Sequence, residues 1–209
     1  KGTLIINGVD TNFPLDPLIW FQRRLFVWNN VVNGGIDFSS STAGLFFHLL
    51  QVIPYKIGFN LQSVQIINLV FWFSLIILNS IIFAKAFFPK SFLIQILFVV
   101  FYAFNPYLFN SWENVKVANL SLISAIPLGL VIIMYLDSKR IDKKRAVFIS
   151  VLIGIILSGS GINPAYFFVF FLILAIFFIS NIMTNFNISS ILFRTKNFLL
   201  VTLVVFLVN

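Results

Sequence analysis

The sequence predicts an all-α fold, a polytopic transmembrane helical bundle with a long first extracytoplasmic loop that carries short interfacial helices. The chain has 209 residues, of which 60% are hydrophobic and only 10% are charged, whereas a soluble domain is about a quarter charged. Its mean hydropathy is +1.02, and the apolar residues form long runs separated by short basic loops. A soluble fold could not cover so much apolar surface, so we expect the lipid bilayer to surround this chain.

Five long apolar stretches and the start of a sixth follow the N-terminal region. A helix needs about 20 apolar residues to cross a bilayer, and Pro164 opens one stretch at a position that favours a helix start. The chain therefore divides into a loop, residues 1–63, and a transmembrane bundle, residues 64–209, which we interpret as a fragment of a longer chain. The expected spans are residues 64–84, 91–108, 117–136, 146–159, 164–183 and, cut short, 198–208.

Nine of the fourteen Lys and Arg residues lie in alternate loops of this ladder, at residues 85–90, 137–145 and 194–196. The intervening loops contain one such residue, Lys116. Short loops rich in Lys and Arg stay in the cytoplasm, so we expect the other loops to face outward together from a plasma membrane. The net charge of +8 is explained by this arrangement, and we expect no nucleic-acid partner.

The long first loop is predicted to contain two short helices at the membrane surface. Asp16 and Pro17 form a helix start, because Asp accepts hydrogen bonds at the N-cap and Pro suits the first helical position. An apolar stripe then follows at helical spacing, with Arg23 and Arg24 away from it; its members are Leu18, Phe21, Leu25 and Trp28. At about 14 residues, this helix suits the interface better than a span.

The second short helix is expected to begin after the Ser/Thr run at residues 39–42 and to end before Pro54, because the residue before a proline avoids the helical conformation. His48, Gln51 and Tyr55 would form its polar stripe. His48 is the only histidine and the chain has no cysteine, so no familiar thiolate or histidine metal site is visible. We expect His48 to be a hydrogen-bonded interface residue.

Asp10 is the best candidate for a catalytic residue, because it lies just before the first interfacial helix. A carboxylate there could take a proton from an attacking hydroxyl as a general base. It could also help to hold a divalent cation beside a phosphate, or satisfy backbone N–H groups in a turn. Asp16 is already explained by its N-cap role, which makes Asp10 the stronger of the two.

Four charged residues of the outward-facing loops are candidates for binding the substrate or its donor. Arg23 and Arg24 could bind a lipid or donor phosphate, or anchor their helix at the interface. Glu113 and Lys116 could form a solvated ion pair at a span start, or Lys116 could lie beside an anionic phosphate. Each of these residues keeps both interpretations on the sequence alone.

Asn163 lies in a Gly-rich turn, residues 158–164, that leads into a predicted span. Such a turn points backbone N–H groups outward at a helix N-terminus, where an anion could bind. An ordinary tight turn is the alternative. The chain contains no P-loop, dinucleotide fingerprint, Gly-x-Ser-x-Gly elbow or zincin pair.

The order of these features resembles the first extracellular loop of the large mycobacterial-type alpha-(1→3)-arabinofuranosyltransferases, which belong to the GT-C class of polytopic glycosyltransferases. The resemblance covers about residues 7–170 and departs at Asn12, where Lys is expected. The segments that carry it are Asp10-Thr11-Asn12, Leu15-Asp16-Pro17, Trp28-Asn29, Ala43-Gly44-Leu45-Phe46-Phe47-His48 and Ser160-Gly161-Ile162-Asn163-Pro164-Ala165.

This resemblance implies an enzyme that takes a sugar from a polyprenyl-phosphate donor on the outer membrane face and passes it to a cell-envelope glycan acceptor. Asp10 matches the catalytic carboxylate of the first outer loop, and Asn163 matches the turn asparagine. Two other functions stay open. One is a lipid or polysaccharide transporter or flippase subunit, for which Asn79, Gln95 and Asn119 are the few polar candidates in the spans. The other is a non-enzymatic membrane scaffold.

Overall fold

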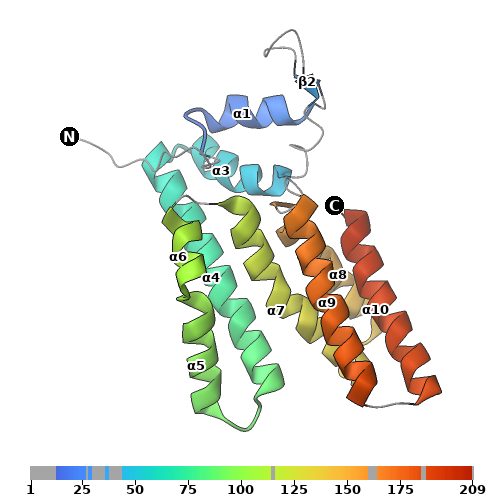
Figure 1. The fold of residues 1–209 in the computed structure, drawn as a ribbon. Helices are drawn as coiled ribbons and strands as arrows, with labels where there is room; N and C mark the ends of the chain where they lie inside the picture. Colours follow the sequence, from blue (N-terminus) through green and yellow to red (C-terminus); the bar gives the residue numbers. More distant parts are fainter. Residues whose placement is uncertain are drawn as a thin grey trace.

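The chain forms a bundle of long apolar helices with two short helices lying across one end (Figure 1). The computed structural model describes residues 13–26, 28–29, 36–37, 44–113, 116–159, 164–184 and 187–208. Among these residues, five helices are long and apolar enough to cross a membrane: Leu61–Phe87, Phe92–Asn110, Ala118–Asp137, Pro164–Met183 and Ile188–Val208. The predicted all-α polytopic bundle is confirmed, and the chain is an integral membrane protein.

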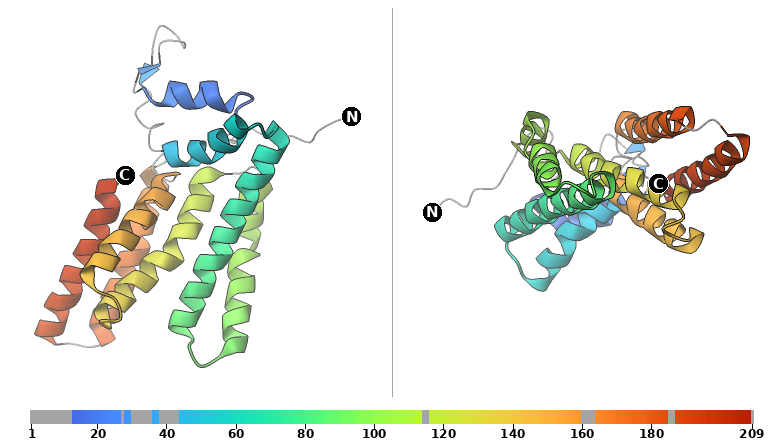
Figure 2. Two further views of the ribbon diagram at one scale, coloured as in Figure 1. Left: turned by 180° about the vertical axis from the view of Figure 1, so that it is seen from behind. Right: turned by 90° about the horizontal axis from the view of Figure 1, so that it is seen from below.

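Helix α1, Pro17–Arg24, is the first of the two short helices that lie across the end of the bundle (Figure 2). The predicted cap is confirmed, since Asp16 Oδ1 accepts hydrogen bonds from the backbone N–H groups of Leu18 and Ile19, each at 3.0 Å. The helix has 8 residues, fewer than the predicted 14 or so. Beyond it, two-residue strands β1, Trp28–Asn29, and β2, Ile36–Asp37, pair in antiparallel fashion.

Helix α3, Leu45–Ile57, runs through Pro54, so the prediction that it ends before this proline is wrong. A proline removes one backbone donor, and one missing hydrogen bond near the last turn does not end the helix. The helix ends instead at Gly58, whose φ of +107° is left-handed. Its N–H donates to the carbonyl oxygens of Pro54 and Tyr55, which is the usual role of glycine at this position.

Helix α4, Leu61–Phe87, is capped by Asn60, whose side chain accepts a hydrogen bond from the Ser63 N–H at 2.8 Å. The next span, Phe92–Asn110, is interrupted by a short break, so that it comprises helix α5, Phe92–Ala103, and most of helix α6, Pro106–Glu113. Asn105 lies at the break. Its Oδ1 accepts from the Leu108 N–H at 2.9 Å and its Nδ2 donates to the Tyr102 carbonyl at 2.8 Å, so the side chain satisfies backbone groups that the break exposes.

The remaining helices are α7, Val117–Asp137, α8, Lys143–Leu157, α9, Pro164–Thr184, and α10, Ile188–Val208. Helix α8 has 15 residues, about 22 Å, which is less than the thickness of a hydrocarbon core. The predicted span at 146–159 is therefore not among the five helices that are long and apolar enough to cross a membrane.

Helix α10 begins ten residues before the predicted span at 198–208, so Arg194 and Lys196 lie inside a helix and not in a loop. Their neighbourhood supplies polar partners. The Arg194 guanidinium donates to the Asn181 carbonyl oxygen on α9, and Asn197 Nδ2 donates to Asp137 Oδ1 on α7 at 2.9 Å. Because these groups are satisfied near the bundle end, the helix can include them.

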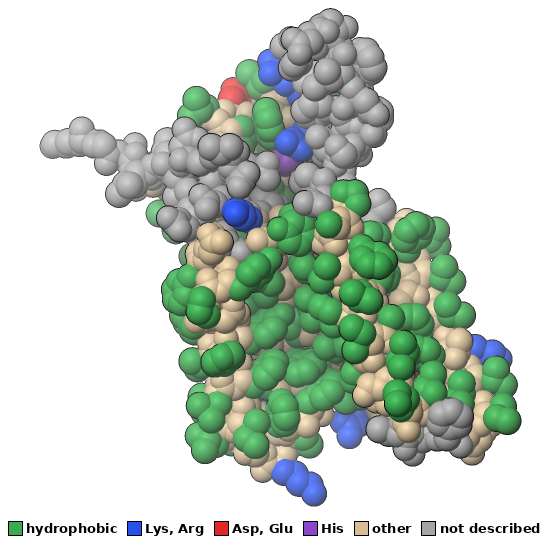
Figure 3. Space-filling model, in the orientation of Figure 1, with side chains coloured by type: hydrophobic (Ala, Val, Ile, Leu, Met, Phe, Trp, Pro, Cys, Tyr) green, Lys and Arg blue, Asp and Glu red, His purple; other side chains and the backbone are tan. Residues whose placement is uncertain are grey.

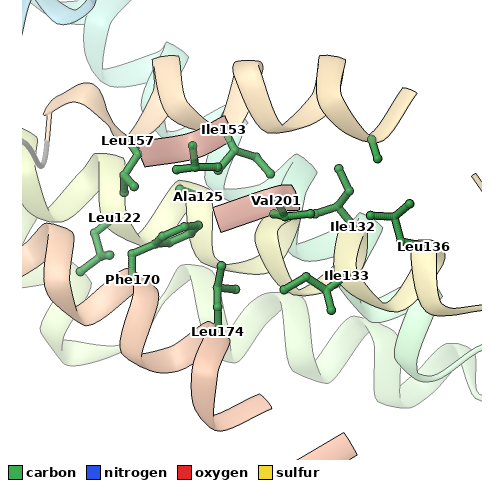
Figure 4. Packing of buried hydrophobic residues seen from close by; sticks show 12 residues of the cluster. Leu122, Ala125, Ile132, Ile133, Leu136, Ile153, Leu157, Phe170, Leu174 and Val201 are labelled. Carbon is green, nitrogen blue, oxygen red and sulfur yellow. The ribbon is translucent and has the colours of Figure 1, made fainter. Parts of the chain in front are cut away.

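Helix α7 is the centre of the bundle and packs against α4, α8, α9 and α10. In its membrane window 72% of the residues are buried, against 28% or less in the other four spans. At Gly129 an added Cβ would lie 3.0 Å from Phe170 Cζ and 3.2 Å from Leu174 Cδ2. A small residue therefore lets α7 and α9 approach closely, beside the core shown in Figure 4.

The helices alternate in direction, so the loops after α4, α7 and α9 lie at the end opposite α1 and α3 (Figures 1 and 2). Lys and Arg side chains appear at both ends of the molecule, with a broad hydrophobic belt between them (Figure 3). Two of the three predicted basic loops, at residues 85–90 and 137–145, lie at the end opposite α1 and α3, whereas Arg194 and Lys196 of the third lie in α10. Which end faces the cytoplasm stays a prediction.

Candidate functional site

The structure describes three of the six predicted site residues in full. Arg23 is exposed on α1, Arg24 on the same helix is 6% exposed, and Lys116 is half-buried at the N-cap of α7. All three lie at the end of the bundle that carries α1 and α3 (Figure 1). Asp10 and Asn163 lie outside the described residues, as does the side chain of Glu113, the last residue of α6.

Arg24 is buried, contrary to the expected arrangement in which it stays off the buried face. Its guanidinium carbon lies 4.7 Å from the centroid of the Trp20 ring, a cation–π contact worth about 0.5–2 kcal/mol. Burial lowers the pKa of Arg24.

The predicted apolar stripe of α1 faces an open groove of about 480 Å³ between α1 and α3, lined in part by Leu18, Phe21 and Leu25.

His48 is fully buried on α3, and the predicted polar stripe of that helix faces inward at this residue and at Gln51. Burial lowers the pKa of His48 to about 4, the positive charge of Arg24 lowers it as well, and the hydrogen bond with Gln51 opposes the shift. The imidazole is therefore neutral at neutral pH. Its Nδ1 donates to Gln51 Oε1 at 3.2 Å, since that oxygen can only accept, and Nε2 keeps an unprotonated lone pair.

Helix α4 contributes the most unusual side chain of this region, Asn68, which is 1% exposed. Neither its Oδ1 nor its Nδ2 has a hydrogen-bond partner among the described residues, and the same is true of Trp72 Nε1, one turn further along the helix. Asn79 lies on the same buried face and differs, since it donates to the Ser124 carbonyl of α7 at 2.8 Å. A buried polar group without a partner costs about 1–3 kcal/mol.

Five residues make up what we call the polar layer: Trp20, Arg24, His48, Asn68 and Trp72. Its members are linked by short contacts across three helices. Arg24 lies over Trp20 and acts electrostatically on His48. The rings of His48 and Phe47 are 5.4 Å apart, Phe47 stacks on Trp72 at 6.3 Å, and Trp72 neighbours Asn68 at i, i+4 spacing. The contacts therefore link α1 to α3 through Arg24 and His48, and α3 to α4 through Phe47 and Trp72.

The polar layer offers both donors and acceptors. Trp20 Nε1, Trp72 Nε1 and Asn68 Nδ2 can donate, while His48 Nε2 and Asn68 Oδ1 can accept, and none of these five atoms has a hydrogen-bond partner in the described part of the chain. Sequence reasoning missed this layer. The only signals were the short spacings of His48 and Gln51 and of Asn68 and Trp72, which do not show that the two helices meet.

A second feature of this region is apolar. A groove of about 340 Å³ lies between α4 and the break that separates α5 from α6. Nearly all of its surface is hydrocarbon, so it suits an apolar chain. Its lining residues are Leu69, Val70, Phe73, Ala103, Phe104 and Phe109.

Among the described residues, no group of three or more His, Cys, Asp or Glu side chains could hold a metal ion. Comparisons with known proteins find no matching family model, no matching curated protein and no matching solved structure. The fold defines the class of the protein, a polytopic α-helical membrane protein. The polar layer, which includes the buried cation Arg24, is its candidate functional site.

Proposed function

We propose that this chain is the membrane-embedded part of a GT-C-type glycosyltransferase. It transfers a sugar, with arabinofuranose as the expected one, from a polyprenyl-phosphate donor to a cell-envelope glycan on the extracytoplasmic face. The observation that carries the proposal is Arg24, a buried cation 4.7 Å from the Trp20 ring on a helix that lies across the end of the bundle. The order of motifs in residues 7–170 supports the same class.

The donor would use three features of that end of the bundle. Its phosphate would lie among Arg23, Arg24 and Lys116, whose charges stabilise an anion best where water is scarce. Its apolar chain would run down the 340 Å³ groove beside α4. Glu113 and Asn163 are the other residues proposed to contact the donor or the acceptor. The bilayer around the spans would hold the rest of the polyprenyl chain.

Asp10 is the proposed general base. Its carboxylate takes the proton of the acceptor hydroxyl while that oxygen forms a bond to the anomeric carbon. The bond between the anomeric carbon and the phosphate oxygen breaks, and the electron pair leaves with the polyprenyl phosphate. A single displacement of this kind inverts the anomeric carbon. If Asp10 instead holds a divalent cation beside the phosphate, transfer stops when a chelator is added.

The test compares two aspartates of the same loop in the full-length protein, reconstituted with a polyprenyl-phosphate arabinofuranose and a glycan acceptor. Asp10→Asn is expected to abolish transfer and leave membrane insertion intact. Asp16→Asn is the matched control, because asparagine also caps helices well, and it should keep most of the activity. Full transfer by Asp10→Asn would contradict the proposed base. Movement of the lipid across the bilayer without a new glycosidic bond would favour a flippase.

A further inference from the structure

We infer that the polar layer between α1, α3 and α4 is a binding site for an uncharged, hydroxyl-rich group, and that His48 Nε2, Asn68 and Trp72 Nε1 are its hydrogen-bonding residues. The inference rests on the proposed function, in which the natural ligand is the sugar ring of the donor. The argument for this site uses none of the residues proposed above to act on the acceptor or to hold the phosphate, apart from Arg24.

The first argument is the absence of partners at a depth where water is scarce. Asn68 is 1% exposed and His48 is fully buried, yet both Asn68 amide atoms and His48 Nε2 have no hydrogen-bond partner among the described residues. Buried polar groups in native proteins are nearly always satisfied, and each exception calls for an explanation such as strain, a catalytic role or a bound molecule. A ligand that supplies the missing partners would remove the cost of burying them.

The second argument is the contrast with Asn79, which lies on the same buried face of α4. Asn79 is 3% exposed and donates to the Ser124 carbonyl, so it has an evident role in joining α4 to α7. Asn68 has no such role. The chain therefore places two buried asparagines on one face of one helix, and only one of them is used by the fold.

The third argument concerns the kind of ligand. The unpartnered atoms comprise two acceptors, His48 Nε2 and Asn68 Oδ1, and donors that include Asn68 Nδ2 and Trp72 Nε1. Hydroxyl groups both donate and accept, so several hydroxyls on one ring can satisfy this mixed set. A bare anion would satisfy the donors alone. Arg24 adds a positive charge at one side of the layer, which would suit a phosphate attached to the ring.

The fourth argument is the supply of flat apolar surface. Phe47 stacks on Trp72 with the ring centroids 6.3 Å apart, and Phe13 contacts Phe47 edge-on at 6.1 Å. Ligand-binding sites in proteins are lined mostly by aromatic and apolar side chains, with a few polar groups that fix the orientation of the ligand.

The experiment uses the full-length protein in nanodiscs and compares farnesyl phosphate with farnesyl phosphoryl arabinofuranose, mannose and glucose by microscale thermophoresis. The lipid and phosphate are the same in all four probes, so any difference reports the sugar. In the wild type we expect at least one sugar to tighten binding about tenfold, equivalent to 1.4 kcal/mol. Asn68→Leu should abolish that gain while affinity for farnesyl phosphate is unchanged.

Stability provides the second readout. Asn68→Leu should keep or raise the unfolding temperature without ligand, because it removes a buried polar group that the fold does not use. Asn79→Leu is the matched control and should lower the unfolding temperature. Trp72→Phe keeps an aromatic ring beside Phe47, loses the indole N–H together with part of the ring volume, and should reduce the gain from the sugar. It serves as the second variant if Asn68→Leu fails to fold.

Two results would overturn the inference. One is equal affinity of the wild type for all four probes, which would mean that the layer binds water or the lipid phosphate and not the sugar. The other is an unchanged sugar-dependent gain in both Asn68→Leu and Trp72→Phe. Failure of the proposed function is separate, because an active Asp10→Asn enzyme removes the base and leaves the binding result standing.

Discussion

Asn197 on α10 donates through Nδ2 to Asp137 Oδ1 on α7 at 2.9 Å, a contact that joins residues 60 positions apart at the basic end of the bundle. Asn197 is 1% exposed, so its amide has no access to water. The contact explains why α10 can begin at Ile188 with polar residues in its first three turns. The arrangement leads to a first prediction about stability.

Asn197→Leu is expected to lower the free energy of unfolding by about 2 kcal/mol, because a buried hydrogen bond to a carboxylate is lost. Thermal unfolding of the purified protein in detergent measures this effect. Thr195→Val is the matched control on the same helix, since its hydroxyl bonds only to the Ile191 carbonyl of its own helix, and it should change stability by less than about 0.5 kcal/mol. Equal stability of the two variants would show that the contact does not hold α7 to α10.

Gly129 is the position where a larger side chain should separate α7 from α9. A Cβ there would lie 3.0 Å from Phe170 Cζ, and the Phe170 ring is fully buried and has little room to move. Gly129→Val should therefore destabilise the protein by about 1–3 kcal/mol. Adding Phe170→Leu should restore part of the loss, because it removes ring atoms from the contact. A double variant less stable than either single variant would contradict this packing.

His48 should make the stability of the protein depend on pH. The pKa of its imidazole falls from 6.5 to about 4 on folding, so the unfolded chain binds more protons between these values. Stability is complete above pH 6.5 and is lost progressively as the pH falls toward 4, by about 3 kcal/mol at most. The charged group that acts on it is Arg24 of α1, and its hydrogen-bond partner Gln51 does not titrate.

Unfolding temperatures between pH 5 and 7.5 measure this dependence. His48→Gln should flatten the profile, and Lys56→Gln on the same helix should leave it unchanged. Because His48 is the only histidine, no other imidazole contributes. If wild type and His48→Gln lose stability in parallel on acidification, His48 is not buried in the neutral form.

The spans could be predicted because a long apolar run has few other stable structures in a bilayer. The grouping of the basic loops follows from the number of spans between them, because two loops separated by two spans lie at the same end of the bundle. The start of α10 could not be predicted, since Arg194 and Asn197 resemble loop residues until their partners Asn181 and Asp137 are in place. Such tertiary partners are separated along the chain and leave no local pattern.

The candidate site was predictable only in part. The sequence indicates Arg24 as a candidate phosphate ligand, but its burial beside Trp20 depends on the packing of the short helices. The sequence indicates His48 only as an interface residue. It does not indicate Asn68 at all, because a lone asparagine in an apolar run has no distinctive spacing. The polar layer forms only when α3 packs against α4, which no periodicity in either helix indicates.

The orientation of the bundle is the claim on which the proposed function most directly depends. Because the chain has no cysteine, single cysteines can be introduced at Asp10, Lys56, Ser138 and Asn163 without background labelling. Lys56 and Ser138 are both exposed and lie at opposite ends of the bundle. A membrane-impermeant maleimide added to intact cells should label positions 10, 56 and 163 and leave position 138 unlabelled until the membrane is permeabilised. Labelling of position 138 alone would place α1, α3 and the polar layer in the cytoplasm and contradict transfer on the outer face.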